Sequence, residues 1–183
     1  MIIQELTKEE SLTLLKGMNL GRLACVSGTQ PYIVPIHFVV DDHYLYGFST
    51  VGKKIEWMRA NPHVCVEADE IVSRHQWITL VLTGMYQELT DTPEWLSVRV
   101  FAHELLQKRA LWWEPGYVQT VLSDGTQRPL LPLYYRIHIM EISGRRAVQD
   151  SRFASGPKDG ASASALPAPG LLQRMFARKP VKS

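Results

Sequence analysis

The chain has 183 residues, 45% of them hydrophobic and 21% charged, which is ordinary globular composition and enough for one core. Its formal net charge of +2 is too small to make nucleic acid the main partner, although a local basic patch could still hold a phosphate. No apolar run approaches the ~20 residues of a membrane span, and the first residues lack a secretory pattern, so we expect a cytoplasmic protein without membrane contact.

The chain opens with a segment that predicts an acidic helix, in which Thr7 and Glu10 have the spacing of a capping box and Gly17 fits the end. A break at residues 50–52 precedes a second, short helix over residues 53–61. Thr92 and Pro93 then predict the start of a third helix. The strands that we expect are residues 21–27, 32–40, 43–49, 64–69, 77–89 and 134–142, with a hairpin joining the second and third.

Six strands joined mostly by short turns favour a mainly β, antiparallel sheet that closes, at least partly, into a barrel with a few short helices. Gly84 interrupts the long fifth strand, where we expect a bulge or bend. The composition changes past about residue 150, where residues 155–170 consist mainly of Gly, Ala, Ser and Pro and a basic end follows. We therefore expect one folded domain over residues 1–148 and a flexible tail over residues 149–183.

Metal chemistry is not expected from this sequence. The two cysteines, Cys25 and Cys65, lie forty residues apart in apolar strand-like runs, which favours two reduced thiols over a disulfide. The six histidines show no metal-ligand spacing, and no paired carboxylates or nucleophile motif stand out.

The run Ser49-Thr50-Val51-Gly52-Lys53-Lys54 carries the clearest chemical signal. A strand ends there, a glycine follows, and a helix begins with two lysines. Unpaired amides at a helix start attract anions, whereas lysines there are unfavourable against the helix dipole by ~0.3–1 kcal/mol each. The pattern is compatible with a solvated lysine pair, and it is also compatible with a phosphate that compensates the charge.

Three further features leave alternatives open. Pro35 within an apolar strand fits an edge strand, a bulge or a place where a planar ring lies beside the backbone. His37 on the same face suits a partly buried structural histidine better than a catalytic one. Trp77, Trp112 and Trp113 suit core packing by default, but a tryptophan pair in a loop also fits an interface or a flat aromatic ligand.

Residues 21–69, from GRLACVSG through PYIVP, VGKK and RANPHVCVEAD, resemble the FMN-binding split barrels of the pyridoxamine 5'-phosphate oxidase-like family. Together with ITLVLTG and RIHIMEISGRRA further along, they look closest to its nitroimidazole-resistance (Nim-type) branch. The resemblance covers about residues 1–147. No single motif is specific, whereas their order and spacing together are.

The resemblance implies a split barrel with FMN in a groove at the interface of a homodimer. The implied phosphate ligands are Ser49, Thr50, Lys53 and Lys54, and the flavin ring would lie along the backbone of Val34, Pro35, Ile36 and His37. Thr79 would also approach the cofactor, with Trp77 and Trp113 as weaker candidates across the interface.

The resemblance further implies an oxidoreductase that passes electrons from reduced nicotinamide to a small acceptor, including nitroaromatic ones. Nim-type proteins often carry histidine where this chain has Phe48, so chemistry assigned to that histidine is in doubt, and we name no catalytic residue. The arginine-rich C-terminal motif of the vitamin B6 oxidases is missing as well. A non-catalytic flavin-binding or redox-sensing protein, and a barrel that binds haem or a deazaflavin, remain alternatives; an oligonucleotide-binding barrel is disfavoured by the apolar strand faces.

Overall fold

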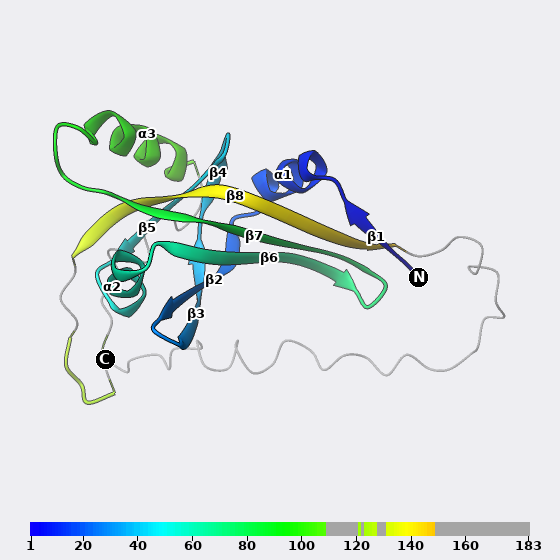
Figure 1. Cartoon of the computed structure of the whole chain (residues 1–183), viewed down its shortest axis with the longest axis horizontal. Helices are drawn as coiled ribbons and strands as arrows, with labels where there is room; N and C mark the ends of the chain where they lie inside the picture. The colour runs from blue at the N-terminus through cyan, green and yellow to red at the C-terminus, as the bar shows by residue number, and fades with distance from the viewer. Residues whose placement is uncertain (109–120, 122, 128–130, 149–183) are drawn as a thin grey trace, which may run out of the picture. The chain divides into compact units, whose positions relative to one another are not determined.

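A computed structural model of the chain describes residues 1–108, 121, 123–127 and 131–148 (Figure 1). The expected tail, residues 149–183, and Trp113 lie outside the described residues. The elements in chain order are β1 (Ile2–Leu6), α1 (Lys8–Gly17), β2 (Leu20–Ser27), β3 (Gln30–His37), β4 (Val39–Asp41), β5 (Tyr44–Thr50), α2 (Lys53–Ala60), β6 (His63–Ser73), β7 (Gln76–Leu89), α3 (Leu96–Leu106) and β8 (Pro132–Val148).

The described strands form one antiparallel sheet with the order β3-β2-β6-β7-β8-β5-β4, and β1 pairs with the end of β8 beyond β5. β3 and β4 lie at opposite ends of this order, yet only Phe38 separates them in the chain. The sheet must therefore curl until its two edges meet at Phe38, while the rest of the seam stays open. This arrangement is the mainly β, split-barrel architecture that the sequence predicts.

The number of strands was predicted wrongly, because the sheet has eight strands and not six. β1 replaces the start of the expected acidic helix: Ile2 pairs with Val148, a partner that no local pattern can reveal. The expected second strand is also two strands, because β3 pairs with β2 whereas β4 pairs with β5 after the chain turns at Phe38. The expected hairpin is therefore confirmed only for β4 and β5.

Local hydrogen bonding confirms the predicted start of α1. The backbone N–H of Thr7 donates to Glu10 Oε2 at 2.8 Å, and the backbone N–H of Glu10 donates to Thr7 Oγ1 at 3.2 Å. The predicted start of α3 is wrong by three residues, since Trp95 N–H donates to the Thr92 carbonyl at 3.1 Å in a turn and the helix begins only at Leu96. The irregularity expected at Gly84 is confirmed by a shift in the β7–β8 register there.

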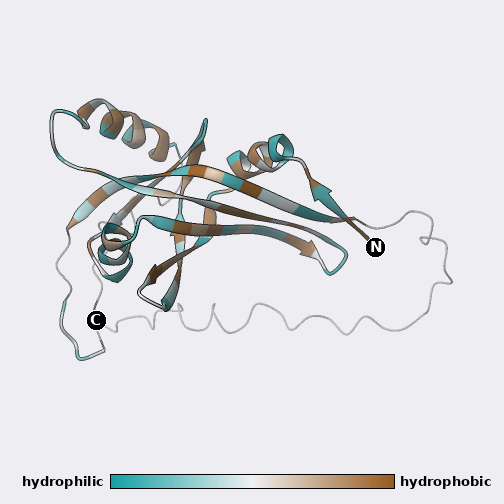
Figure 2. Cartoon of the chain, in the orientation of Figure 1, coloured by the Kyte–Doolittle hydropathy of each residue, from teal (hydrophilic) through white to brown (hydrophobic). Residues whose placement is uncertain are grey.

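Two clusters of buried apolar side chains hold the described residues together, and Figure 2 shows the alternation of apolar and polar residues along the strands that produces them. The larger cluster fills the barrel, with Leu23, Leu45, Val66, Leu82 and Tyr135 among its members. The smaller one consists of Val39, Tyr46, Phe48, Leu89, Ala102 and Leu106 beneath α3. Because both faces of β5 are covered, its residues from Leu45 to Ser49 are buried without interruption.

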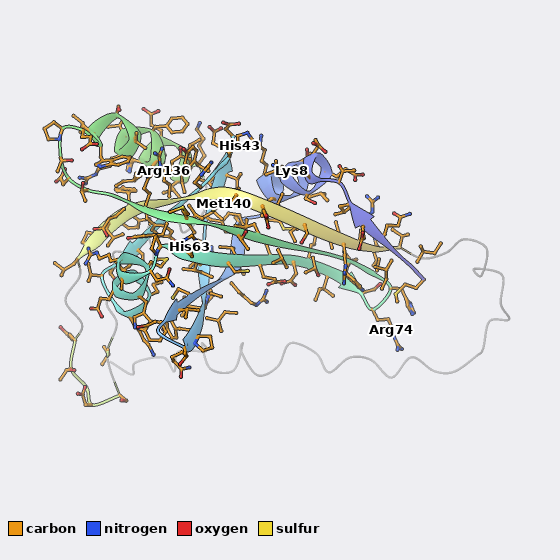
Figure 3. All side chains as sticks on the ribbon, in the orientation of Figure 1. Lys8, His43, His63, Arg74, Arg136 and Met140 are labelled. Atoms are coloured by element: carbon orange, nitrogen blue, oxygen red, sulfur yellow. The ribbon has the colours of Figure 1, made fainter. Side chains whose placement is uncertain are left out.

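An arginine stacked between two aromatic rings supports α3 on the sheet. Figure 3 shows Arg136 on β8 close to α3. Its guanidinium carbon lies 4.2 Å from the ring centre of Tyr44 and 5.2 Å from that of Trp95, and its Nε donates to Gln87 Oε1 at 2.7 Å. The stacking and the hydrogen bond fix β8 against both β7 and the segment that leads into α3.

The pairing of Gly47 with Tyr135 is a testable constraint of the barrel. A Cβ at Gly47 would overlap the buried ring of Tyr135, which lies directly opposite on β8. We expect Gly47→Ala to lower the free energy of unfolding by about 1–3 kcal/mol, the usual range for overpacking. Gly17→Ala is the matched control, because a Cβ there meets nothing within 4 Å. Urea titrations of both variants check this, and equal midpoints would contradict it.

Candidate functional site

The end of β5 places a buried hydroxyl next to the start of α2. Ser49 is 2% exposed, and among the described residues only Ser11 is another buried polar side chain. Ser49 Oγ donates to the Thr50 carbonyl at a long 3.3 Å, whereas Ser11 Oγ donates to the Thr7 carbonyl at 2.8 Å. The Ser49 hydroxyl is therefore held weakly at the point where the expected anion site begins.

The N-cap residue of helix α2 is Gly52, so no side chain caps the helix. The Gly52 carbonyl accepts from the backbone N–H of Ile55 at 2.9 Å and of Glu56 at 3.0 Å, and no side chain bonds to the first amides. Those amides carry the positive end of the helix dipole, which favours a negative charge nearby. Lys53 and Lys54 are the first two residues of this helix.

Lys53 lies against two aromatic rings. Its Nζ is 4.5 Å from the ring centre of Tyr32 and 4.6 Å from that of Trp57, and these two rings are 5.5 Å apart at an angle of 60°. Tyr32 comes from β3, whereas Trp57 lies one turn further along α2. This contact joins the expected flavin strand to the expected phosphate helix.

Lys54 differs from the exposed Lys53, because its side chain is largely buried. Burial lowers the pKa of its ammonium, and the neighbouring Cys25 offsets this only in part. Burial also raises the pKa of the Cys25 thiol, against the effect of the two lysines. In the described part of the chain, no carboxylate forms an ion pair with Lys53 or Lys54. Among the described residues, these two adjacent lysines therefore have no carboxylate counter-ion.

The four residues expected along the flavin ring lie in β3, an end strand of the sheet order. Pro35 is exposed and faces Arg22 of β2, so an edge position alone explains a proline there. Val34 and Ile36 share the inner face with Tyr32, and Ile36 is buried while Val34 and His37 are half-buried. The structure thus links β3 to the lysines through Tyr32.

Trp77 and Thr79 lie elsewhere, in a groove of about 420 Å³ on β1, β7 and β8. Glu5, Leu6, Trp77, Thr79, Val81, Ser143, Gly144 and Arg145 line it, and none of them comes from β3, β5 or α2. Arg145 is the cation of this groove and is 3.8 Å from the carboxylate of Glu5. Within one chain, the expected cofactor residues therefore form two separate groups.

Phe48, at the position where Nim-type proteins often have histidine, belongs to the cluster beneath α3 and is 3% exposed. Its ring centre is 4.8 Å from that of Tyr134. The side chain is therefore directed to the face of β5 opposite the barrel interior.

The orientation of α2 depends on an ion pair with β7. Arg59 Nε and Nη2 donate to the two carboxylate oxygens of Glu88, each at 2.7 Å, and Tyr86 Oη donates to Glu88 Oε2 at 2.9 Å. The hydrogen bond from Arg59 holds the pKa of Glu88 below its ordinary value of 4.5, and Tyr86 lowers it further. This network holds the C-terminal end of α2, the helix whose other end carries both lysines.

Reasoning from the sequence missed Tyr32, Trp57 and Arg145 as site residues. The spacing of Lys53 and Trp57, four residues apart on a helix, predicts their contact and could have been used. The contact of Tyr32 depends on how α2 packs on the β2–β3 hairpin, and that of Arg145 on the long pairing of β7 with β8.

Other site classes find no support in the described residues. They contain no group of three or more His, Cys, Asp or Glu side chains that could hold a metal ion. The two cysteines are free thiols. No helix in this part of the chain is long and apolar enough to cross a membrane.

Comparison with known proteins decides the family. The family model described as pyridoxamine 5'-phosphate oxidase matches residues 7–146. The chain belongs to the pyridoxamine 5'-phosphate oxidase family. A protein of Rhizobium meliloti (strain 1021) is 37% identical over 147 residues, which cover 80% of this chain and 97% of that protein. The predicted family is therefore confirmed.

Solved structures of the family share this fold. A Mesorhizobium loti protein described as FAD-binding is 36% identical with a TM-score of 0.66, covering 81% of this chain and 99% of that one. A Bacteroides thetaiotaomicron protein whose name refers to 5-nitroimidazole antibiotic resistance is 16% identical with a TM-score of 0.56, covering 80% and 89%. At this identity the likeness is one of fold alone.

The Arg59–Glu88 pair makes stability dependent on pH. Since the folded-state pKa of Glu88 is lowered, its stabilisation is complete above about pH 4.5, the ordinary pKa, and is lost as the pH falls through the folded-state value. We expect Glu88→Gln to lower the free energy of unfolding by about 1–2 kcal/mol at pH 7, because Arg59 loses a charged acceptor. The difference should shrink below pH 4.5.

Chemical denaturation at pH 7 and pH 3.5 measures this effect. Glu104→Gln serves as the control, since Glu104 is an exposed carboxylate on α3. A Glu88→Gln penalty that stayed the same at both pH values would show that the charge of Glu88 is unimportant.

Proposed function

We propose that this protein is an FMN-binding oxidoreductase that passes electrons from a reduced nicotinamide to a small acceptor, including nitroaromatic compounds. One observation carries the proposal: the first two residues of α2 are lysines that form no ion pair with any described carboxylate, and no side chain caps the first amides of this helix. Two further facts favour a flavin over any other phosphate ester. The chain belongs to a family with flavin-binding relatives, and Lys53 contacts Tyr32 of β3, the strand expected along the flavin ring.

The residues fit the ribityl phosphate of a flavin. A phosphate dianion takes charge-assisted hydrogen bonds from ammonium groups, from helix N-terminal amides and from hydroxyls. Residues 49–54 offer all three kinds of group: the ammonium groups of Lys53 and Lys54, the first amides of α2, and the hydroxyls of Ser49 and Thr50. The dianion would also favour the charged form of Lys54, against the burial that lowers its pKa.

The identity of the flavin is the finer question. FMN and FAD share the ribityl phosphate, and relatives of known structure are described as FAD-binding proteins. Nothing in the two-lysine site itself requires the adenosine half of FAD. We therefore propose FMN, and direct comparison of the two flavins in binding experiments separates them.

A second copy of the chain would complete the site. Thr79 and Trp77 belong to the proposed cofactor site but line a different groove from the lysines in one chain. In a twofold dimer with the flavin at the interface, the lysine group of one protomer would meet the Thr79 groove of its partner. The outward-facing residues of β7 that such an interface would cover include Val81, which is 38% exposed.

A bound flavin would supply the electron-transfer chemistry, and the chain would hold it. Lys53 and Lys54 would fix the phosphate, and the β3 backbone from Val34 to His37 would lie along the ring. His37 is half-buried and is the candidate to hold a proton near the ring, although we assign no catalytic residue. A non-catalytic flavin-binding or redox-sensing role would use the same contacts.

The absorbance spectrum of the purified protein, followed by turnover with reduced nicotinamide and a nitroaromatic acceptor, tests the proposal. We expect flavin bands and acceptor-dependent oxidation of the nicotinamide. Bound flavin without turnover would favour the sensing role, and a Soret band would indicate haem. Colourless protein that fails to bind added FMN, FAD or deazaflavin at micromolar concentrations would overturn flavin binding altogether.

Removing both lysines tests the phosphate assignment. We expect Lys53→Ala combined with Lys54→Ala to weaken FMN binding by about 2–4 kcal/mol, on the order of two charge-assisted hydrogen bonds. Riboflavin, which lacks the phosphate, should lose little affinity. Flavin fluorescence titration measures both, with Lys16→Ala plus Lys108→Ala as a control of equal charge change on exposed residues. Equal losses for FMN and riboflavin would contradict the assignment.

A charge on the outer face of β7 tests the proposed dimer. Because an unpaired charge buried in an interface costs several kcal/mol, we expect Val81→Arg to raise the dimer dissociation constant by at least about tenfold and to weaken FMN binding. Multi-angle light scattering across a dilution series follows the assembly. Val100→Arg is the control, since Val100 is 50% exposed on α3. An unaltered Val81→Arg dimer would place the interface elsewhere.

A further inference from the structure

The aromatic pair around Lys53 is not part of the site that the sequence predicts. Tyr32 and Trp57 are both half-buried, and their rings pack against the main hydrophobic cluster, so they are fixed in place. The exposed Lys53 places its ammonium about equally far from both ring centres, at 4.5 Å and 4.6 Å. An exposed lysine that contacts two fixed rings has lost much of the freedom of its four-carbon chain.

From this contact we propose that Tyr32 and Trp57 are positioning residues of the phosphate site, which act by holding the ammonium of Lys53 beside the start of α2. The proposal rests on the proposed function, since it assumes that a flavin phosphate binds there.

Electrostatics explains why rings are suited to this task. Lys53 occupies the first position of α2, where the helix dipole repels a cation, and Lys54 is the next residue. Left alone, the long side chain of Lys53 would move its charge away into solvent. Cation–π attraction, about 0.5–2 kcal/mol, is of the size needed to oppose a dipole penalty of ~0.3–1 kcal/mol.

Aromatic rings also differ from a carboxylate in their effect on the charge of Lys53. A carboxylate would hold Lys53 by neutralising it, and a phosphate would then have to displace a counter-ion. The aromatic faces hold the cation without cancelling its charge, and the described residues offer no carboxylate partner to Lys53. The positive charge therefore stays available to a phosphate.

The two lysines then have different roles. Lys54 is fixed by burial next to Cys25, whereas Lys53 is fixed at the surface by Tyr32 and Trp57. A phosphate dianion would meet one cation from the protein interior and one from the rim, both already oriented. Tyr32 also belongs to β3. One side chain therefore aligns the phosphate site with the strand expected along the flavin ring.

The ratio of FMN affinity to riboflavin affinity isolates this effect, because only FMN carries the phosphate. We expect Trp57→Leu to lower the ratio about three- to tenfold, as the loss of one cation–π partner predicts, with Tyr32→Leu acting in the same direction. The Trp57→Leu effect should vanish in a Lys53→Met background, where no cation remains to be held. Such non-additivity would not arise from a merely structural role.

Fluorinated tryptophan guards against variants that fold poorly. Incorporation of 5-fluorotryptophan weakens cation–π attraction with little change of shape, so it should lower the ratio in the wild-type chain and not in Lys53→Met. An unchanged ratio in Trp57→Leu, or an equal drop in the presence and absence of Lys53, would overturn the proposal.

Three other outcomes are distinguishable. A higher ratio in Trp57→Leu would mean that the rings withhold Lys53 from the phosphate, which also overturns the proposal. If wild-type protein bound neither FMN nor riboflavin, the proposed function itself would fail. If it bound both with equal affinity, flavin binding would survive and the phosphate site, together with its aromatic pair, would not.

Discussion

The split barrel depends on the single residue, Phe38, that separates β3 from β4 in the chain. These strands belong to opposite ends of the sheet, and Phe38 alone connects them. Phe38 is 1% exposed, and its backbone N–H donates to the Asn19 carbonyl at 3.0 Å, where α1 gives way to β2. The curl that this connection enforces brings β3, the end of β5 and α2 to one side of the barrel. The proposed phosphate site is thus a consequence of how the sheet closes.

The charge distribution of that site runs against local preference. Two lysines at the start of a helix oppose the dipole, and Lys54 is desolvated as well. The core and the Arg59–Glu88 pair hold α2 in place despite this cost. Natural chains keep such unfavourable groups mainly where function needs them. The aromatic contact of Lys53 is consistent with that view, because it stabilises the cation without neutralising it.

The features that could be predicted from the sequence are those set by residues close together in the chain. The capping box of Thr7 and Glu10, the irregularity at Gly84 and the lysines after Gly52 all rest on short spacings. β1 was missed because its pairing joins Ile2 to Val148, and alternation over five residues is too weak to reveal it. The break at Phe38 was hidden because a buried aromatic continues the apolar pattern of β3 into β4.

The candidate site divides along the same line. The expected ligands at the β5–α2 turn lie together because they are consecutive in the chain, whereas Trp77 and Thr79 lie in another groove. Long-range packing decided which aromatic side chains surround Lys53, so only Trp57, one helical turn away, was within reach of a spacing rule. A flavin needs an anion site for its phosphate and an apolar floor for its ring. In the proposed site, one protomer would supply the first at α2 and an open sheet face at β7. Twofold symmetry would then form two equivalent sites, since an isologous interface repeats every contact.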